Sequence, residues 1–326
     1  MKKSILLILG FVATSILFAQ SKTVGLFPIM ENGKSGYIDS TGKIVINPQF
    51  QGAEDFSEGL AAVKINGKWG YIDTTGNIVV TPQFFLVFNF SDGLAKVRFG
   101  SWQSPSKYGY IDKSGKLVID TLYQAVGDFS DGLAWIKVDA RYGFIDKLGK
   151  QVIDPQFDVA QNFSNGLAVV KNKNKYGYIN NKGKYAFKSR FDKTGKFSEG
   201  LASVKIGGKY GYIDTSGKIV IKPQFDDARD FYEGLASVEI KRQWGYVDKS
   251  GKIVIKPQFV KVSDFSEGMA TFVSNMKYGF INTKGEAVIE PQFYVANNFS
   301  NGVAKVMVGY LNTYIDKTGK FIWEPK

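Results

Sequence analysis

The residue types that most often perform acid–base or nucleophilic chemistry at neutral pH are missing from this sequence. None of its 326 residues is a histidine or a cysteine. The composition therefore excludes Ser-His-Asp and Cys-His nucleophile systems, His/Cys zinc sites and disulfides. It also excludes any unperturbed side chain that titrates near pH 7. We expect a protein that is not an enzyme and that holds no cofactor and no metal ion.

Carboxylates are the remaining candidates for catalysis, as the acid–base pair of a glycoside hydrolase. The most conspicuous of them share one recurring turn motif, Asp-x-x-Gly. They are Asp39, Asp73, Asp112, Asp146, Asp214, Asp248 and Asp316, with Asn180 and Asn282 in the same position. A turn tolerates this exchange because either side chain accepts a hydrogen bond from the backbone two residues on. A catalytic acid does not tolerate it, and a calcium site needs more oxygen donors than the single one offered here.

A hydrolase would have to use acids that fall outside the turn motif, such as Asp120, Asp139 or Glu286. Two of their carboxyl groups would have to converge to a separation on the order of 5–10 Å. Nothing in the sequence brings them together. A carboxylate-based glycoside hydrolase is therefore the alternative to a binding function.

Two stretches with unusual chemistry favour binding. Residues 100–106 form a polar insertion that carries Trp102. The insertion is either drift that is neutral to the fold or a loop that presents an aromatic residue for contact with carbohydrate or protein. A second stretch gathers basic residues within 15 positions. These are Lys182, Lys184, Lys188, Arg190, Lys193 and Lys196. Trp102 and this cluster are the candidate binding residues, the cluster being a candidate anion site, with a solvated surface as the alternative.

The elements that position these residues are copies of one repeat. A glycine between two aromatic residues recurs every 34 residues, except in one interval of 39 that contains the insertion. The glycines are Gly36, Gly70, Gly109, Gly143, Gly177, Gly211, Gly245 and Gly279, with Thr313 in the last equivalent position and Ser35 replacing one aromatic residue. Periods of 20–50 residues are typical of solenoids, propellers and other arrays. The chain contains eight complete units and a truncated ninth.

The residue pattern of each unit, as in residues 209–239, predicts three short β-segments separated by tight turns. The turn Asp214-Thr-Ser-Gly217 precedes the apolar run 219–221, which leads into Pro223. Because proline cannot donate to a ladder, it must end strand pairing there or lie at a sheet edge. Helical periodicity is nowhere sustained over ten residues. Two phenylalanine columns recur at the repeat spacing, and we expect them to pack between units. They are Phe50, Phe84, Phe157, Phe225, Phe259 and Phe293, and Phe56, Phe90, Phe129, Phe163, Phe197, Phe231, Phe265 and Phe299.

Two units contain the hexapeptides KWGYID at 68–73 and QWGYVD at 243–248, followed by Gly-Lys, Pro-Gln-Phe and Phe-Ser-Glu-Gly-Leu-Ala steps. With these motifs the chain resembles the WG-containing repeat family of bacterial proteins over residues 24–323. The resemblance implies tandem β-rich repeats, frequent export and a role in binding, with no general activity and no catalytic residues to carry over.

We predict an all-β fold of tandem 34-residue hairpin or meander repeats. An open solenoid or superhelical array is favoured, because 34 residues are few for a propeller blade and nine is an unusual number of blades. The alternative is a closed β-propeller-like ring in which the N-terminal strand completes the last blade.

Residues 1–19 combine two lysines with a continuous apolar run that ends at Ala19, the pattern of a secretory signal peptide. We predict that this segment is removed and that residues 20–326 form one repeat array without a transmembrane segment. Removal of Lys2 and Lys3 lowers the net charge from +12 to +10. A basic surface attracts anionic lipid headgroups or acidic glycans, and export argues against nucleic acid as a partner.

These observations together predict an exported, monomeric, non-enzymatic protein that is periplasmic, at the cell surface or secreted. We expect it to present an extended surface to a protein or an envelope glycan. A module associated with polysaccharide or peptidoglycan is the other binding interpretation.

Overall fold

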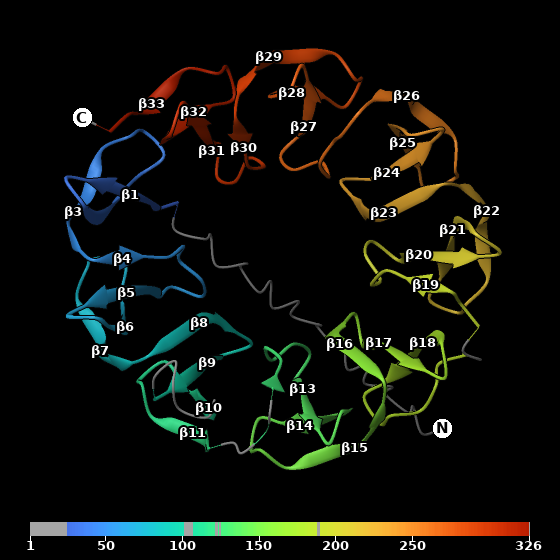
Figure 1. Cartoon of the computed structure of the whole chain (residues 1–326), viewed down its shortest axis with the longest axis horizontal. Helices are drawn as coiled ribbons and strands as arrows, with labels where there is room; N and C mark the ends of the chain where they lie inside the picture. Colours follow the sequence, from blue (N-terminus) through green and yellow to red (C-terminus); the bar gives the residue numbers. More distant parts are fainter. Residues whose placement is uncertain (1–24, 101–106, 121–122, 124, 188–189, 326) are drawn as a thin grey trace, which may run out of the picture.

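The computed structural model describes residues 25–100, 107–120, 123, 125–187 and 190–325. The described strands form nine antiparallel sheets, arranged as blades around a ring (Figure 1). The prediction of an all-β chain built from tandem repeats is confirmed. None of the described segments is an apolar helix of bilayer-spanning length.

Each blade is a contiguous stretch of chain whose strands follow one another from the centre of the ring to its rim (Figure 1). Blade 1 contains β1 (Phe27–Glu31), β2 (Lys34–Ile38) and β3 (Ile44–Phe50). Blade 2 contains β4 (Gly52–Ala53), β5 (Ala61–Ile65), β6 (Lys68–Ile72) and β7 (Ile78–Phe84). Blade 3 contains β8 (Leu86–Ser91), β9 (Leu94–Phe99), β10 (Lys107–Ile111) and β11 (Leu117–Asp120). Blade 4 contains β12 (Ala125–Val126), β13 (Leu133–Val138), β14 (Arg141–Asp146) and β15 (Gln151–Phe157), blade 5 contains β16 (Val159–Ser164), β17 (Leu167–Asn172) and β18 (Lys175–Asn180), and blade 6 contains β19 (Lys193–Thr194), β20 (Leu201–Ile206), β21 (Lys209–Asp214) and β22 (Ile219–Phe225).

The last three blades complete the ring. Blade 7 contains β23 (Asp227–Tyr232), β24 (Leu235–Ile240), β25 (Gln243–Asp248) and β26 (Ile253–Phe259), blade 8 contains β27 (Met269–Ser274), β28 (Lys277–Asn282) and β29 (Ala287–Phe293), and blade 9 contains β30 (Val295–Ala296), β31 (Val303–Val308), β32 (Leu311–Asp316) and β33 (Phe321–Trp323). Single bridges supply a fourth segment to blade 5, through Tyr176 and Phe191, and to blade 8, through Val262 and Phe272.

The array is closed, so the ring is observed rather than the open solenoid that the sequence argument favours. A 34-residue unit suffices for a four-stranded blade because all its strands are short, two to seven residues along the described chain, and tight turns join them. The expectation of three strands per unit misses the innermost strand. The ends of the chain share no sheet within the described residues, since β33 pairs with β32 and β1 pairs with β2.

The glycine that defines the repeat is required by a close approach of the backbone. A Cβ atom on Gly245 would lie 2.4 Å from the Ile255 carbonyl oxygen and 2.6 Å from the Pro257 nitrogen. The register between β25 and β26 shifts at this point, so residues 256–258 bulge over the glycine. Thr313 takes this position in blade 9, where β33 ends at Trp323 and the described chain has no such bulge.

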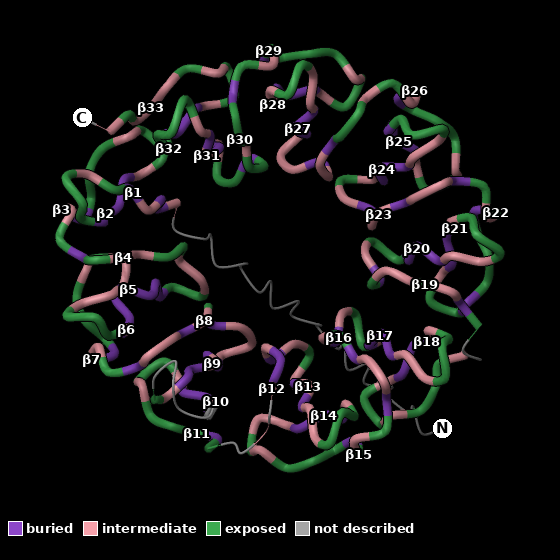
Figure 2. The backbone as a smooth tube through the Cα atoms, viewed as in Figure 1, coloured by how far each residue is buried: buried purple, intermediate pink, exposed green. Residues whose placement is uncertain are grey.

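Aromatic side chains pack neighbouring blades together, as predicted for the two phenylalanine columns. In the first column, Phe84 of blade 2 lies 5.6 Å, centroid to centroid, from Phe99 of blade 3. Phe90 of blade 3 lies 4.9 Å, centroid to centroid, from Tyr71 of blade 2. Phe265 of blade 8 lies 4.7 Å from Tyr246 of blade 7. Buried residues accordingly concentrate in the middle strands of each blade, and exposed residues at the turns (Figure 2).

The Asp-x-x-Gly turns have the structural role that the sequence predicts. The Asp73 carboxylate accepts hydrogen bonds from the backbone N–H groups of Thr75 at 2.9 Å and Asn77 at 3.0 Å. Asn180 in blade 5 accepts the two equivalent bonds with its side-chain oxygen. The hydrogen bond from the Thr75 hydroxyl lowers the pKa of Asp73, so this carboxylate stays ionised as a turn cap.

Candidate functional site

A tyrosine hydroxyl links many of the neighbouring blades. The Tyr71 hydroxyl of blade 2 donates to the Phe88 carbonyl of blade 3 at 2.6 Å, and the Tyr246 hydroxyl of blade 7 donates to the Ser263 carbonyl of blade 8 at 2.7 Å. In both cases the acceptor belongs to the innermost segment of the next blade. Burial raises the pKa of both tyrosines, so each hydroxyl keeps its proton and remains a donor.

The contact between blade 9 and blade 1, which we call the seam, departs from this pattern. Within the described residues blade 1 begins at β1 and has no inner strand. The Tyr314 hydroxyl instead donates to the Pro28 carbonyl of β1 at 2.6 Å, across 286 positions of sequence. Phe27 packs against the Tyr314 ring at a centroid distance of 5.6 Å and takes the place of a column phenylalanine. Side-chain packing and this hydrogen bond therefore close the ring.

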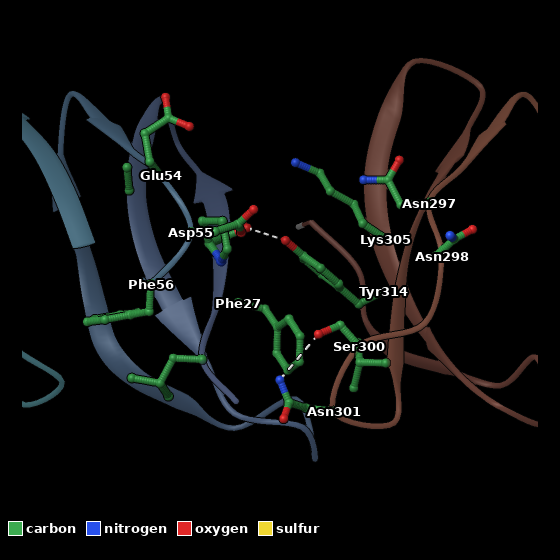
Figure 3. Close-up of a pocket in the computed structure, with 14 residues that line it drawn as sticks. Phe27, Glu54, Asp55, Phe56, Asn297, Asn298, Ser300, Asn301, Lys305 and Tyr314 are labelled. Carbon is green, nitrogen blue, oxygen red and sulfur yellow. Dashed lines mark hydrogen bonds between the residues drawn. The ribbon is translucent and has the colours of Figure 1, made fainter. Parts of the chain in front are cut away.

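A cavity of about 380 Å³, which we call the seam cavity, lies beside this contact. Its lining residues are Leu26, Phe27, Pro28, Ala53, Glu54, Asp55, Phe56, Asn297, Asn298, Ser300, Asn301, Val303, Lys305 and Tyr314. The wall from blade 2 carries two carboxylates, and the wall from blade 9 carries Lys305 and side-chain amides (Figure 3). The arrangement offers donors and acceptors to a polar ligand next to three aromatic rings, those of Phe27, Phe56 and Tyr314.

Lys305 has a counterpart in blade 3 that shows what a lysine at this position binds. The Lys96 ammonium group reaches the inner strand of blade 4, where it donates to the Val126 carbonyl at 3.3 Å and pairs with the Asp128 carboxylate at 3.3 Å. Lys305 has the same place in the repeat and lines the seam cavity. No described strand supplies an equivalent carbonyl and carboxylate there.

Two carboxyl groups from neighbouring blades face a second cavity, of about 320 Å³. Asp230 of β23 and Asp264 of blade 8 line it together with Arg229 and Ser203. Burial raises the pKa of Asp230 to about 6, against the opposing effect of the Lys196 ammonium group, and the Asp264 carboxylate raises it further. Burial also raises the pKa of Asp264, although the Arg229 guanidinium group opposes this. We call these two residues the acid pair.

The acid pair has neighbours that explain its position. A Cβ atom on Gly195 would lie 2.4 Å from an Asp230 carboxylate oxygen and 2.6 Å from the Ser203 hydroxyl. Glycine at 195 therefore lets Asp230 approach blade 6. The described residues contain no group of three or more His, Cys, Asp or Glu side chains placed to hold a metal ion.

The family model described as "WG containing repeat" matches eight times, over residues 36–69, 69–101, 108–142, 142–176, 176–210, 210–241, 244–277 and 278–311. The chain belongs to this family. Each match begins in the middle of one blade and ends in the middle of the next, so the WG unit of sequence is offset from the blade of structure.

The WG repeat ring also resembles solved structures. A crystal structure described as that of the eukaryotic initiation factor matches with a TM-score of 0.65 and 12% identity, covering 92% of this chain and 95% of that chain. Hsv2p of Kluyveromyces lactis matches with a TM-score of 0.43 and 10% identity, covering 70% of this chain and 91% of that one. The first similarity concerns the fold alone, and the second is too weak to support an argument. No curated protein matches the chain.

The basic cluster predicted from the sequence of this WG repeat protein does not form one patch. Lys182 and Lys184 are exposed on the turn that follows β18. Arg190 is committed to the next blade, because its guanidinium group donates to the Gly217 carbonyl at 2.7 Å. Trp102 and Lys188, like the expected signal peptide at 1–19, lie outside the described residues.

The other two residues of the cluster lie in blade 6. Lys193 begins β19, and Lys196 follows that strand, with its ammonium group 5.8 Å from the centroid of the Tyr232 ring. The cluster is therefore spread over the turn of blade 5, the link to blade 6 and the neighbourhood of the acid pair. As binding residues, its members remain predictions.

The single acids named as hydrolase candidates lie on three different blades. Asp120 ends β11 of blade 3, Asp139 lies in the hairpin turn of blade 4, and Glu286 follows the turn of blade 8, where it accepts a hydrogen bond from Asn282. Sequence reasoning missed the acid pair. Each acid of the pair directly precedes a phenylalanine of the second column, Phe231 or Phe265. The residue at this position varies between Asp, Asn and Lys along the chain, as an unconstrained surface residue would.

Proposed function

We propose that this WG repeat protein is an exported, non-enzymatic binding scaffold of the cell envelope. We further propose that it holds its partner, a protein or a glycan, at the seam cavity. The observation that carries the proposal is the break in the symmetry of the ring. At the seam a lysine, two carboxylates and several amides surround a cavity that no described strand fills. A cavity with a few convergent polar groups is the usual form of a binding site.

Three further considerations support the proposal. The lysine-rich, apolar segment at residues 1–19 favours export. The chain has no histidine or cysteine for nucleophilic catalysis. Function is also commonly added where a regular architecture is interrupted. That the protein acts as a monomer and does not bind nucleic acid remain predictions.

The test is capture of a partner from envelope fractions with residues 20–326. Asn298→Arg places a bulky cation in the seam cavity, and we expect it to abolish capture. Asn89→Arg is the matched control, because Asn89 is an exposed residue at the same repeat position in blade 3, away from the seam. The proposal fails if both variants capture the partner as well as the unmodified chain does.

A separate arm tests the residues predicted from sequence. It combines Trp102→Ala with charge reversal of Lys182, Lys184, Lys188 and Arg190. Loss of capture in this arm alone would move the binding site from the seam to the interrupted fifth unit and the insertion.

The acid pair favours a second candidate function, a carboxylate-based glycoside hydrolase. Asp230 and Asp264 line the same cavity, and a carboxyl group whose pKa is about 6 suits a general acid. The measurement is release of reducing ends from envelope polysaccharides by the unmodified chain and by Asp230→Asn. Activity that survives this substitution, or no activity in either protein, would eliminate the hydrolase.

A further inference from the structure

We propose that the partner held at the seam cavity is an extended peptide segment that adds as a strand to the inner edge of β1 and presents a carboxylate to Lys305. This inference rests on the proposed function and names the class of partner. It follows from how the inner strands of the other blades are held.

Blade 2 shows the hydrogen bonds that an inner strand makes. The Gln51 N–H group donates to the Lys64 carbonyl of β5 at 2.9 Å, and the Glu54 N–H group donates to the Ala62 carbonyl at 3.0 Å. Both acceptors lie on the edge of β5 that faces the centre of the ring. An inner strand therefore needs two carbonyls, two residues apart, on the second strand of its blade.

The inner edge of β1 offers the same two acceptors. Val63 pairs with Gly70 and Ile29 pairs with Gly36, both at the repeat glycine, so Met30 and Pro28 correspond to Lys64 and Ala62. Within the described chain β1 pairs with β2 only. An exposed strand edge of this kind is the template for strand addition by an extended peptide.

Pro28 and Trp135 hold the same position in their blades. Each pairs with the residue that follows the repeat glycine, Pro28 with Tyr37 and Trp135 with Phe144. In blade 4 the Trp135 carbonyl accepts the N–H group of Gly127, a residue of the inner segment, at 2.8 Å. The carbonyl of Pro28 is therefore the equivalent acceptor in blade 1.

If a strand is added at the seam, the Tyr314 hydroxyl still has a hydrogen-bond acceptor. In blade 4 the Gly127 carbonyl accepts the Tyr110 hydroxyl at 2.5 Å. At the seam the Tyr314 hydroxyl donates to the Pro28 carbonyl instead. An added peptide would donate its N–H group to Pro28 and accept the Tyr314 hydroxyl with its own carbonyl. Each of these polar groups would then stay paired when the peptide binds.

The side chains around the seam select the sequence of the peptide. Lys305 favours a carboxylate placed as Asp128 is placed for Lys96, two residues after a small aliphatic side chain such as Val126. A neighbouring cavity of about 250 Å³, lined in part by Ile29, Met30, Leu311 and Trp323, accommodates apolar groups of the peptide. Phe27 already packs on Tyr314, so the peptide needs no phenylalanine after its carboxylate.

The chain itself provides the probe. A synthetic hexapeptide with the sequence of residues 123–128, Tyr-Gln-Ala-Val-Gly-Asp, carries this pattern. Its binding to residues 20–326 is measured by calorimetry. We expect about tenfold weaker binding to Lys305→Ala, since a charge-assisted contact is lost. Lys96→Ala, the same position in blade 3, is the matched control and leaves the affinity unchanged.

Two altered peptides separate main-chain pairing from charge. N-methylation of the glycine removes the N–H group that donates to Pro28, and we expect at least a roughly tenfold loss of affinity. Replacement of the aspartate by lysine tests the contact with Lys305 and has a similar expected effect. Strand addition is overturned if the methylated peptide binds as well as the parent peptide does.

The remaining outcomes distinguish this inference from the proposed function. If the peptide does not bind but Asn298→Arg still abolishes capture from envelope fractions, the partner is of another class, such as a glycan, and strand addition is wrong. If the peptide binds as expected but Asn298→Arg leaves capture intact, the proposed function is wrong. If the peptide binds only after deletion of residues 20–24, that segment of the chain is the occupant and the inference is overturned.

Discussion

Asp230 is expected to lower the stability of the ring at neutral pH, and its replacement by asparagine tests this. Burial raises the pKa of Asp230 from 3.8 to about 6 in the folded state. A difference of about two pKa units corresponds to about 3 kcal/mol, at about 1.4 kcal/mol per unit. Because Asp230 is only partly buried, solvent screening makes this an upper bound.

The sign of the pH dependence follows from proton binding. The folded state binds the proton of Asp230 more tightly than the unfolded state does. Protonation of Asp230 therefore stabilises the fold, and this contribution is fully present below about pH 4. That contribution is lost as the pH rises from about 4 to about 6. An asparagine side chain has no proton to lose. We therefore expect Asp230→Asn to be more stable than the unmodified chain at pH 7, by up to about 3 kcal/mol, and similar to it at pH 4.

Thermal unfolding between pH 4 and pH 8 measures this difference. For a chain of this size, about 3 kcal/mol corresponds to a rise in Tm of roughly 5 °C. Asp226→Asn is the control, and we expect it to be less stable than the unmodified chain at pH 7, because the hydrogen bond from Lys209 lowers the pKa of Asp226. The reasoning is refuted if Asp230→Asn is less stable at pH 7, or if its advantage is the same at pH 4 as at pH 7.

Three further predictions concern the repeat itself. Gly245→Ala is expected to lower the free energy of unfolding by about 3 kcal/mol or more, because its Cβ would overlap the backbone at Ile255. Gly234→Ala, at a φ of 79° with open space around it, is expected to lower it by about 1–2 kcal/mol. Urea unfolding compares the two variants. Tyr246→Phe removes the donor to the Ser263 carbonyl and is expected to cost about 1–2 kcal/mol in the same assay, and an unchanged midpoint would show that the bond does not stabilise the ring. The hydrogen bond from the Ser250 hydroxyl lowers the pKa of Asp248, so the stability lost in Asp248→Ala relative to the unmodified chain is present at pH 7 and disappears as the pH falls below about 4; a loss that persists at pH 3 would contradict this.

Much of the fold is predictable from the sequence because the repeat fixes local structure. The spacing of Gly245 and its equivalents predicts the unit, and the exchange of Asp73-type residues for Asn180 predicts turn caps, which the structure confirms. The inner strand is not predictable in this way. A strand as short as Gly52–Ala53 shows no alternation of apolar and polar residues, and the six-residue inner strand Asp227–Tyr232 does not alternate strictly either.

Ring closure and the candidate site escape sequence reasoning for a different reason. Closure depends on how each blade is rotated against the next, and that rotation is set by contacts between residues of different units, such as Phe90 with Tyr71. The contact of Tyr314 with Pro28 joins positions 286 apart, and Asp230 and Asp264 belong to different units. A sequence pattern with a period of 34 residues reveals what the units share, whereas these sites arise where units meet.

The contiguity of each blade also bears on how such a protein changes its size over generations. Every described sheet is built from one uninterrupted stretch of chain. Duplication or deletion of a 34-residue segment therefore adds or removes a whole blade without cutting a hydrogen-bonded ladder. The seam still joins the first blade to the last, so its contacts are inherited with them. Closure of the larger or smaller ring then requires that every pair of neighbouring blades adjusts its rotation to the new number.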